Sequence, residues 1–352
     1  MSSRSIVFTL LGMLLLSACQ RTDLDLPVPE FTVGQALSTT ATFDSLQMDQ
    51  WLQQVCSWPH RRVGSTNWQS AMSEIETIFQ QLGYTELQKD FFDIQYWECT
   101  NRSLSIQLDG ESYAMPAFFD AYCGFTPPEG LTAELVYVGQ QVEDDENLTG
   151  KIAVVDMTFS SNSATGLPNP VVRPNHLSFP ENSALSGGDA YWQAKQAGAL
   201  GVIFILADFH ENISDYLYIP HEDMIRSLPA LFVGNRDGIK LRCFAQEGRT
   251  ANLMVEGIFE TRQVYNLWTS LPGQSTENLI ISTHGDAPFR GVIEDGSGLV
   301  SVFSQAQAWM AEPLENRPKT LHFVITAGHL YKDSPGGVVF SSLHPSIINE
   351  TA

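Results

Sequence analysis

One stretch of the sequence, residues 261–329, sets strands and a helix in a fixed order, and this order constrains the fold most strongly. The segments TRQVYNLWTSLPG, ENLIISTHGD and TLHFVITAGH are apolar runs typical of strands, and helical periodicity covers residues 298–311. Strands that alternate with helices form a parallel or mixed sheet with helices packed on it. The sequence therefore predicts an α/β fold, in which a mixed sheet is flanked by helices.

The segment from Phe43 to Leu82 predicts two helices of the same domain. Apolar residues recur at helical spacing in WLQQVCSW and in SAMSEIETIFQQLGY, and Gly83 follows the second run where a C-cap glycine belongs. Between these helices, residues 60–65 predict a polar loop that a packed core would not need. After Gly83, the alternating runs LQKDFFDIQYW and RSLSIQL predict strands.

The middle of the chain has a different character. Short apolar, β-branched runs, LTAELVYVG, KIAVVDM, AGALGVIFIL and LPALFVG, are separated by turn residues, and DAYWQAKQAG resembles a helix between two of them. We therefore expect a small β-rich domain at residues 115–256, inserted into an outer domain made of residues 41–114 and 257–352. The proline-rich residues 168–180 predict a surface loop of the inserted domain.

The first 19 residues have the features of an export signal. Arg4 gives a small positive region, and residues 6–16 form an apolar segment too short to span a bilayer comfortably. The segment ends in LSAC, which resembles the bacterial lipobox and implies acylation of Cys19. Several acyl chains would anchor the protein stably in a membrane of the cell envelope, and Gln20 favours the outer membrane in the same resemblance. Residues 20–40 predict a polar tether.

Composition excludes one class of partner and predicts the state of the cysteines. The net charge of -21 argues against nucleic acid, which needs clustered basic residues. In an oxidising compartment, Cys56, Cys99, Cys123 and Cys243 predict one or two disulfides, with all three pairings open. None has the CxxC spacing of a thiolate zinc site.

The candidate chemistry lies where the strand ENLIISTHGD ends. His284 and Asp286 close this strand, and Asp295 follows in a glycine turn that leads into a helix. Open α/β sheets place their sites at such strand ends. Imidazole and carboxylate groups are ordinary zinc ligands, and a second carboxylate near the histidine can hold its ring. The sequence thus predicts zinc binding by His284 and Asp295, with Asp286 orienting His284.

The segment STHGDAPFRGVIEDGSG resembles the zinc-dependent aminopeptidase and carboxypeptidase family, which also contains the transferrin receptor ectodomain and the glutaminyl cyclases. In that family a strand delivers H-x-D, and an aspartate in a GA-x-D-N-x-SG turn bridges two zinc ions. The resemblance implies that His284 binds the first zinc, that Asp286 orients it and that Asp295 is the bridging ligand. Gly296 stands where the family usually has asparagine.

The resemblance extends from about residue 45 to the C-terminus. RRVGSTN and the following amphipathic run are similar to the N-terminal peptidase region of the family. The segments LTGKIAVVD, QAKQAGALGVIFI and LPALFVG are similar to a protease-associated (PA) domain, which is thought to shape substrate access. The resemblance therefore implies a zinc exopeptidase fold with an inserted PA domain, and peptides as substrates.

Two positions depart from the family pattern near the end of TLHFVITAGH. His329 replaces the glutamate that serves as general base, and an imidazole can fill this role near neutral pH. His329 has two further interpretations, as a metal ligand or as a partly buried polar residue at a strand end. Leu330 stands where a zinc-ligating glutamate is expected, and leucine cannot bind metal.

The remaining family ligands, an aspartate and a histidine, come from strands and helices beyond the position of Ala352. We therefore expect a C-terminally incomplete domain in which His344 is the only further histidine downstream, and we expect His344 to be a surface residue. The missing elements would leave apolar faces of FVITAGHLY and GVVFSSL open, which favours self-association.

Three functions remain open on these grounds. The first is an exported, lipid-anchored zinc exopeptidase of the aminopeptidase type, holding one or two zinc ions, with His329 as its base. The second is a catalytically inactive protein that uses the peptidase fold for binding, which Leu330 favours. The third is an acyltransferase like the glutaminyl cyclases, which share the fold with a single zinc.

Overall fold

The protein was analysed as a computed structural model of the 352-residue chain, which describes residues 43–143, 145–157, 190–207 and 223–351. The predicted export signal with Cys19, the tether and the proline-rich loop lie outside these residues. Within the described part, no helix is both long and apolar enough to span a bilayer.

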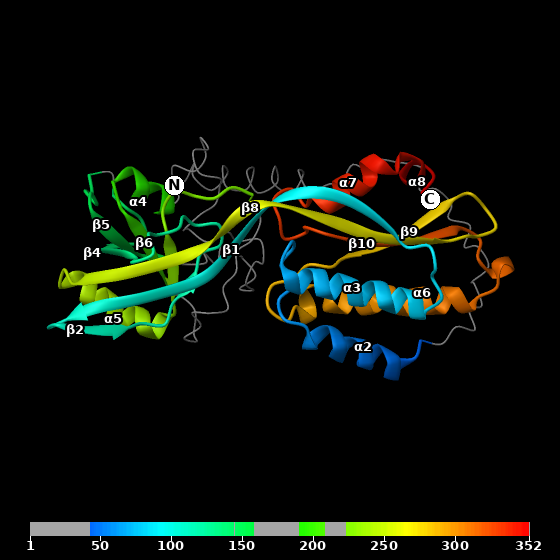
Figure 1. The fold of residues 1–352 in the computed structure, drawn as a ribbon, viewed down its shortest axis with the longest axis horizontal. Helices are drawn as coiled ribbons and strands as arrows, with labels where there is room; N and C mark the ends of the chain where they lie inside the picture. Colours follow the sequence, from blue (N-terminus) through cyan, green and yellow to red (C-terminus); the bar gives the residue numbers. More distant parts are fainter. Residues whose placement is uncertain (1–42, 144, 158–189, 208–222, 352) are drawn as a thin grey trace, which may run out of the picture. The chain divides into compact units, whose positions relative to one another are not determined.

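Two long strands organise the sheet (Figure 1). β1 (Gln88–Leu108) and β8 (Thr250–Leu271) pair antiparallel along nearly their whole length. The beginning of β8 also pairs with β4 (Leu131–Gly139), and its end pairs with β10 (Thr320–Thr326). β10 in turn pairs in parallel with β9 (Asn278–His284). The predicted mixed sheet is confirmed.

Beyond β4, the strands β5, β6 and β7 follow one another across the sheet in the order of the chain. β4, β5, β6 and β7 pair in parallel, β3 pairs antiparallel with β7, and β2 pairs antiparallel with β1. Two helices pack against these strands. The bounds of these elements are β2 (Glu111–Ala114), β3 (Phe118–Phe119), β5 (Lys151–Met157), α4 (Ala190–Gln196), β6 (Gly201–Leu206), β7 (Ala230–Val233) and α5 (Asn235–Gln246).

Helices cover both faces of the sheet formed by β9, β10 and the end of β8 (Figure 1). α2 (Ser45–Ser57), α3 (Thr66–Gln81) and α6 (Ser297–Ala311) lie on one face, and α7 (Pro335–Leu343) and α8 (Pro345–Asn349) lie on the other. A short 3-10 turn at Leu314–Asn316 connects α6 to β10.

The aromatic core explains this arrangement. On the α3 face, Phe79 packs edge to face against Phe303, while Tyr84 packs against Phe323 of β10. On the α7 face, Trp268 packs edge to face against Phe340. Both faces of β10 are therefore buried, as in a strand of a sheet flanked by helices.

Capping side chains and a glycine define the ends of the two predicted helices. The Asp44 side chain accepts hydrogen bonds from the first turn of α2, and the Ser65 hydroxyl accepts one from the backbone N–H of Trp68 in α3. α3 ends just before Gly83, whose φ of +101° suits a glycine after a helix. The two helices predicted between Phe43 and Leu82 are confirmed.

Three expectations from the sequence need correction. LQKDFFDIQYW and RSLSIQL belong to one strand, β1, which absorbs the polar residues between them by a register shift between Cys99 and Asn101. The predicted disulfides are wrong, because all four cysteines of the described residues are free thiols. The expected open apolar face at FVITAGHLY is also wrong, because Phe323, Val324 and Ile325 are all buried. In GVVFSSL, however, Val338 and Leu343 are 64% and 56% exposed.

Candidate metal centre

The site lies at the carboxyl ends of two neighbouring parallel strands. His284 closes β9 and is the register partner of Thr326 at the end of β10. The chain leaves β10 through Gly328, which has a φ of +80°, and reaches His329. A one-turn π-type segment, Val292–Gly296, precedes α6 and carries Glu294 and Asp295. Three chain segments that are separate in the sequence therefore meet at one edge of the sheet.

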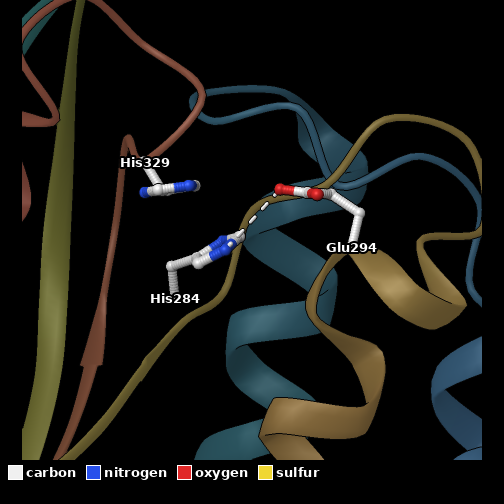
Figure 2. Close-up of side chains that lie close together, drawn as sticks. All are labelled: His284, Glu294 and His329. Atoms are coloured by element: carbon white, nitrogen blue, oxygen red, sulfur yellow. Dashed lines mark ion pairs between the residues drawn. The ribbon is translucent and has the colours of Figure 1, made fainter. Parts of the chain in front are cut away.

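His284, Glu294 and His329 form a cluster of potential metal donors (Figure 2). One donor atom from each lies within 4.8 Å of the others. The His284 Nε2 atom is 3.7 Å from Glu294 Oε1, and the two imidazole rings stack with their centroids 4.1 Å apart. Two imidazoles and one carboxylate are a donor set that catalytic zinc sites use. The residues present therefore fit a zinc ion.

The His284 ring is oriented by the residue two positions further on. Its Nδ1 atom lies 2.9 Å from the Asp286 carbonyl oxygen and 3.7 Å from the Asp286 carboxylate. An Nδ1–H that donates to the carbonyl leaves the lone pair on Nε2, which faces Glu294. Burial lowers the pKa of His284, but the interactions with Asp286 and Asp295 outweigh it and raise the pKa.

The Asp286 carboxylate also holds the backbone at His329. Asp286 is fully buried, and its two oxygens accept hydrogen bonds from the backbone N–H groups of Gly328, His329 and Leu330 at 3.0, 3.1 and 2.9 Å. Burial would raise the pKa of Asp286, yet the His284 ring and the backbone N–H groups of Leu330 and His329 lower it. One side chain thus links two of the three clustered residues.

Asp295 lies beside the cluster and is tied to the end of β9. Its carboxylate accepts hydrogen bonds from the Thr283 hydroxyl and from the backbone N–H of His284. Its Oδ2 atom lies 3.5 Å from His284 Nε2. Gly298 leaves room for this carboxylate, because a Cβ atom there would come within 2.1 Å of Asp295 Oδ1.

The structure adds Glu294, which sequence reasoning missed. Glu294 is the acidic residue directly before Asp295 in EDGSG, so an acidic pair in the strand-to-helix turn was the available signal. Consecutive residues of a regular helix or strand point in different directions. Here non-helical backbone angles at both residues allow their carboxylates to approach His284 together.

A buried arginine positions the segment that carries Glu294. Arg61 is fully buried, so the expectation that a packed core does not need residues 60–65 is wrong at this position. Its guanidinium donates four hydrogen bonds, to the carbonyl oxygens of Gly285, Arg290, Gly291 and Glu294. The loop before α3 therefore fixes the turn at the metal centre.

Leu330 and His344 contribute no donor to the cluster. Leu330 offers only its backbone N–H, which is bonded to Asp286. His344 Nε2 lies 2.9 Å from Asp90 Oδ2, and its ring packs edge to face on Trp268. His344 is partly buried by these contacts on the α7 face rather than being a simple surface residue.

Comparisons with known proteins bear on the fold and on the inserted domain. The family model of the PA domain matches residues 131–241, within the range expected for the inserted domain, whose boundaries remain a prediction. No curated protein sequence gives a match.

Among solved structures, a peptidase M28 precursor from Shewanella amazonensis SB2B has a TM-score of 0.64 at 20% identity, covering 90% of this chain and 71% of that chain. BSAP, a zinc aminopeptidase from Bacillus subtilis, has a TM-score of 0.65 at 16% identity, covering 88% of this chain and 68% of that chain. An aminopeptidase from Aneurinibacillus sp. strain AM-1 has a TM-score of 0.54 at 19% identity, with the same two coverages, 88% and 68%. The chain therefore has the mixed α/β fold of these peptidases and contains a PA domain.

Proposed function

We propose that the chain is a zinc-dependent exopeptidase of the aminopeptidase type, exported and anchored to the cell envelope through acylated Cys19. The observation that carries the zinc-dependent part is the convergence of His284, His329 and Glu294 at the carboxyl ends of β9 and β10. The fold shared with a zinc aminopeptidase supports zinc as the metal and peptides as substrates. The LSAC segment supports the anchor.

In this proposal one zinc ion is held by His284 Nε2, a His329 ring nitrogen and a Glu294 carboxylate oxygen. Zinc in such a site lowers the pKa of a bound water and polarises the carbonyl of the bond to be cleaved. The surrounding residues fix the donors beforehand, since Asp286 sets the ring of His284 and the backbone of His329. A second ion would lack a ligand at Leu330, so we assign a single one.

Asp295 then becomes the candidate general base. His329 cannot serve as base while its ring supplies a metal donor, so another group near the centre must accept the proton of the attacking water. The Asp295 carboxylate lies 3.5 Å from His284 Nε2 and is held by two hydrogen bonds from β9. This proposal gives Asp295 the proton-accepting role in place of the bridging role that the family resemblance implies.

A peptide-binding protein without turnover is the second candidate. Leu330 favours it, because this position offers no side-chain donor, and His329 leaves the usual base position without a carboxylate. Such a protein could still bind zinc through the three clustered residues. Zinc content alone therefore does not separate the candidates, and turnover must be measured with it.

The test measures zinc and activity on the same purified protein. We expect one zinc per chain by elemental analysis, and hydrolysis of some members of a panel of amino-acid p-nitroanilides. His284→Ala and Glu294→Gln should each lose zinc and activity together. Asp295→Asn should retain zinc and lose at least about 100-fold in kcat, the usual contribution of a general base.

His344→Ala is the matched control, because it removes an imidazole outside the cluster and should leave zinc content unchanged. Zinc that persists in His284→Ala, or no zinc in the unaltered protein, contradicts the metal assignment. One zinc per chain without turnover on any substrate supports the binding protein instead.

A further inference from the structure

A cavity of about 400 Å³ lies next to the segment that follows Asp286. Its volume falls within the range of small-ligand sites, about 300 to 1,000 Å³. One wall is aromatic and is formed by Phe118, Phe119 and Phe289. Charged side chains from the loop before α3 and from the middle of β1 form another wall.

The aromatic wall is held in a defined arrangement. The rings of Phe118 and Phe119 are buried and stacked, with their centroids 4.2 Å apart, and the Phe289 ring lies 6.3 Å from that of Phe118. Phe289 has a φ of +47°, a left-handed conformation that bulky residues rarely adopt. Backbone strain of this kind persists where the surroundings impose it, and it concentrates at ligand sites.

For one arginine of the charged wall, the described part of the chain supplies no acidic partner. Arg62 forms an ion pair with Glu98 at 3.5 Å. For Arg102, no carboxylate among the described residues lies within ion-pair distance, although the chain has 40 acidic and only 19 basic residues. The Arg102 Nε–H donates to the Ala117 carbonyl oxygen at 3.1 Å.

Stacking keeps the Arg102 guanidinium against the aromatic wall. Its central carbon lies 4.8 Å from the Phe118 ring centroid and 5.6 Å from that of Phe119. A guanidinium that is already oriented loses little entropy when it binds, and its planar donors match a carboxylate. An anionic ligand therefore fits the charged wall, and its methylene groups fit the aromatic one.

The cavity adjoins the candidate metal centre. Arg62 lines the cavity and also a small neighbouring pocket, which Asp286 and Leu330 line as well. Leu330 is the residue after His329, and Phe289 follows Asp286 by three positions. A peptide bound with one end at the metal centre can therefore place a nearby group in the cavity.

We infer that this cavity is a subsite for a carboxylate of the peptide substrate, with Arg102 as its ion-pair partner and the three phenylalanines packing against the adjoining methylenes. The inference rests on the proposed function only in taking a peptide as the ligand. The carboxylate belongs either to an acidic side chain or to a free C-terminus.

Calorimetric titration with three peptides tests the subsite. Ala-Glu-Ala-amide carries only a side-chain carboxylate, Ala-Ala-Ala carries only a C-terminal one, and Ala-Gln-Ala-amide carries neither. We expect one of the first two to bind at least about tenfold more tightly than the third, and the arm that gains affinity identifies the source of the carboxylate. Arg102→Met should abolish the difference, and Arg102→Lys should restore part of it.

Arg290→Met is the matched control, because Arg290 is exposed and does not line the cavity. Equal binding of all three peptides, no binding of any of them, or a preference that survives in Arg102→Met overturns the inference. If Arg102→Met does not fold, loss of the preference at high salt in the unaltered protein replaces it as the test. Zinc content is measured in parallel, so a failed metal assignment with an intact carboxylate preference is recognised separately.

Discussion

Asp286 connects two residues of the candidate metal centre, His284 and His329. Its carboxylate accepts three backbone N–H groups from residues 328–330 and is fully buried. We expect Asp286→Ala to lower the free energy of unfolding by roughly 2 to 5 kcal/mol. The buried N–H of Gly328 left unpaired costs about 1 to 3 kcal/mol, and the partly buried N–H groups of His329 and Leu330 cost less, because water can reach them. Urea denaturation measures this loss.

The free energy of unfolding of Asp286→Asn should lie between that of Asp286→Ala and that of the unaltered protein, because the amide oxygen of asparagine can still accept some of these hydrogen bonds. If Asp286→Ala unfolds at the same urea concentration as the unaltered protein, the three hydrogen bonds do not organise the turn at His329.

We expect His60 to make the protein less stable in acid. Burial, with the charge of Arg62, lowers the pKa of His60 from 6.5 to about 4, while Glu98 acts in the opposite direction. The unfolded chain therefore binds this proton more readily, and stability is lost as the pH falls from about 6.5 towards 4. His60→Gln should reduce this loss by about 1 kcal/mol, after allowance for partial exposure.

The measurement is urea unfolding of both proteins at several pH values within this window. Above this pH window, the difference in free energy of unfolding between the two proteins should not change with pH. A pH dependence that is identical in His60→Gln would show that other groups cause the acid sensitivity.

Sequence reasoning predicted His284, Asp286 and Asp295 because they are close in the sequence and resemble a known motif, and it predicted His329 from the resemblance at the end of a later strand. It did not identify Glu294 or the role of Arg61. Their positions depend on the irregular turn before α6, whose backbone angles follow from contacts between distant segments. A residue whose function depends on such a turn carries no periodic signal of its own.

At the scale of elements, the loop between α2 and α3 fixes the turn that carries Glu294. Arg61→Met would remove four hydrogen bonds from a charged donor and leave carbonyl groups buried. We expect a loss of roughly 3 to 5 kcal/mol in the free energy of unfolding, with weaker zinc binding as the turn loosens. Urea denaturation and zinc titration measure the two effects.

Arg290→Met changes an exposed side chain of the same turn, so it should alter stability by no more than about 0.5 kcal/mol. Equal effects of the two substitutions would contradict the role given to Arg61.

Most helices and strands could be predicted from the sequence, but the continuity of β1 across two predicted strands could not. α2, α3, α6, β9 and β10 follow from periodicity and caps that the sequence shows directly. The continuity of β1 did not follow, because the polar residues around Thr100 resemble a turn. β8 supplies hydrogen bonds to both sides of this interruption, and one register shift accommodates it. The disulfide prediction failed because an oxidising compartment, as predicted from the sequence, would permit bridges but would not bring thiols together.

At the scale of the whole molecule, the apolar surface of α7 is a candidate contact for self-association. Val338 and Leu343 are 64% and 56% exposed. We expect the double variant Val338→Ser, Leu343→Ser to self-associate less at high concentration, with a stability change of no more than about 1 kcal/mol. Sedimentation velocity measures the association.

Ile239→Ser, which changes an exposed apolar residue of α5, is the control and should not alter self-association. A double variant that associates as strongly as the unaltered protein would exclude α7 as the contact surface.

The shared strands β1 and β8 have a consequence for how the molecule opens. One ladder runs from the residues that pair with β4 to those that pair with β10, without a linker between them. We expect this ladder to open as one cooperative unit, so that opening at one end disturbs the other. A ligand that stabilises the metal-centre end should therefore slow amide hydrogen exchange in the strands around β4, which never touch it.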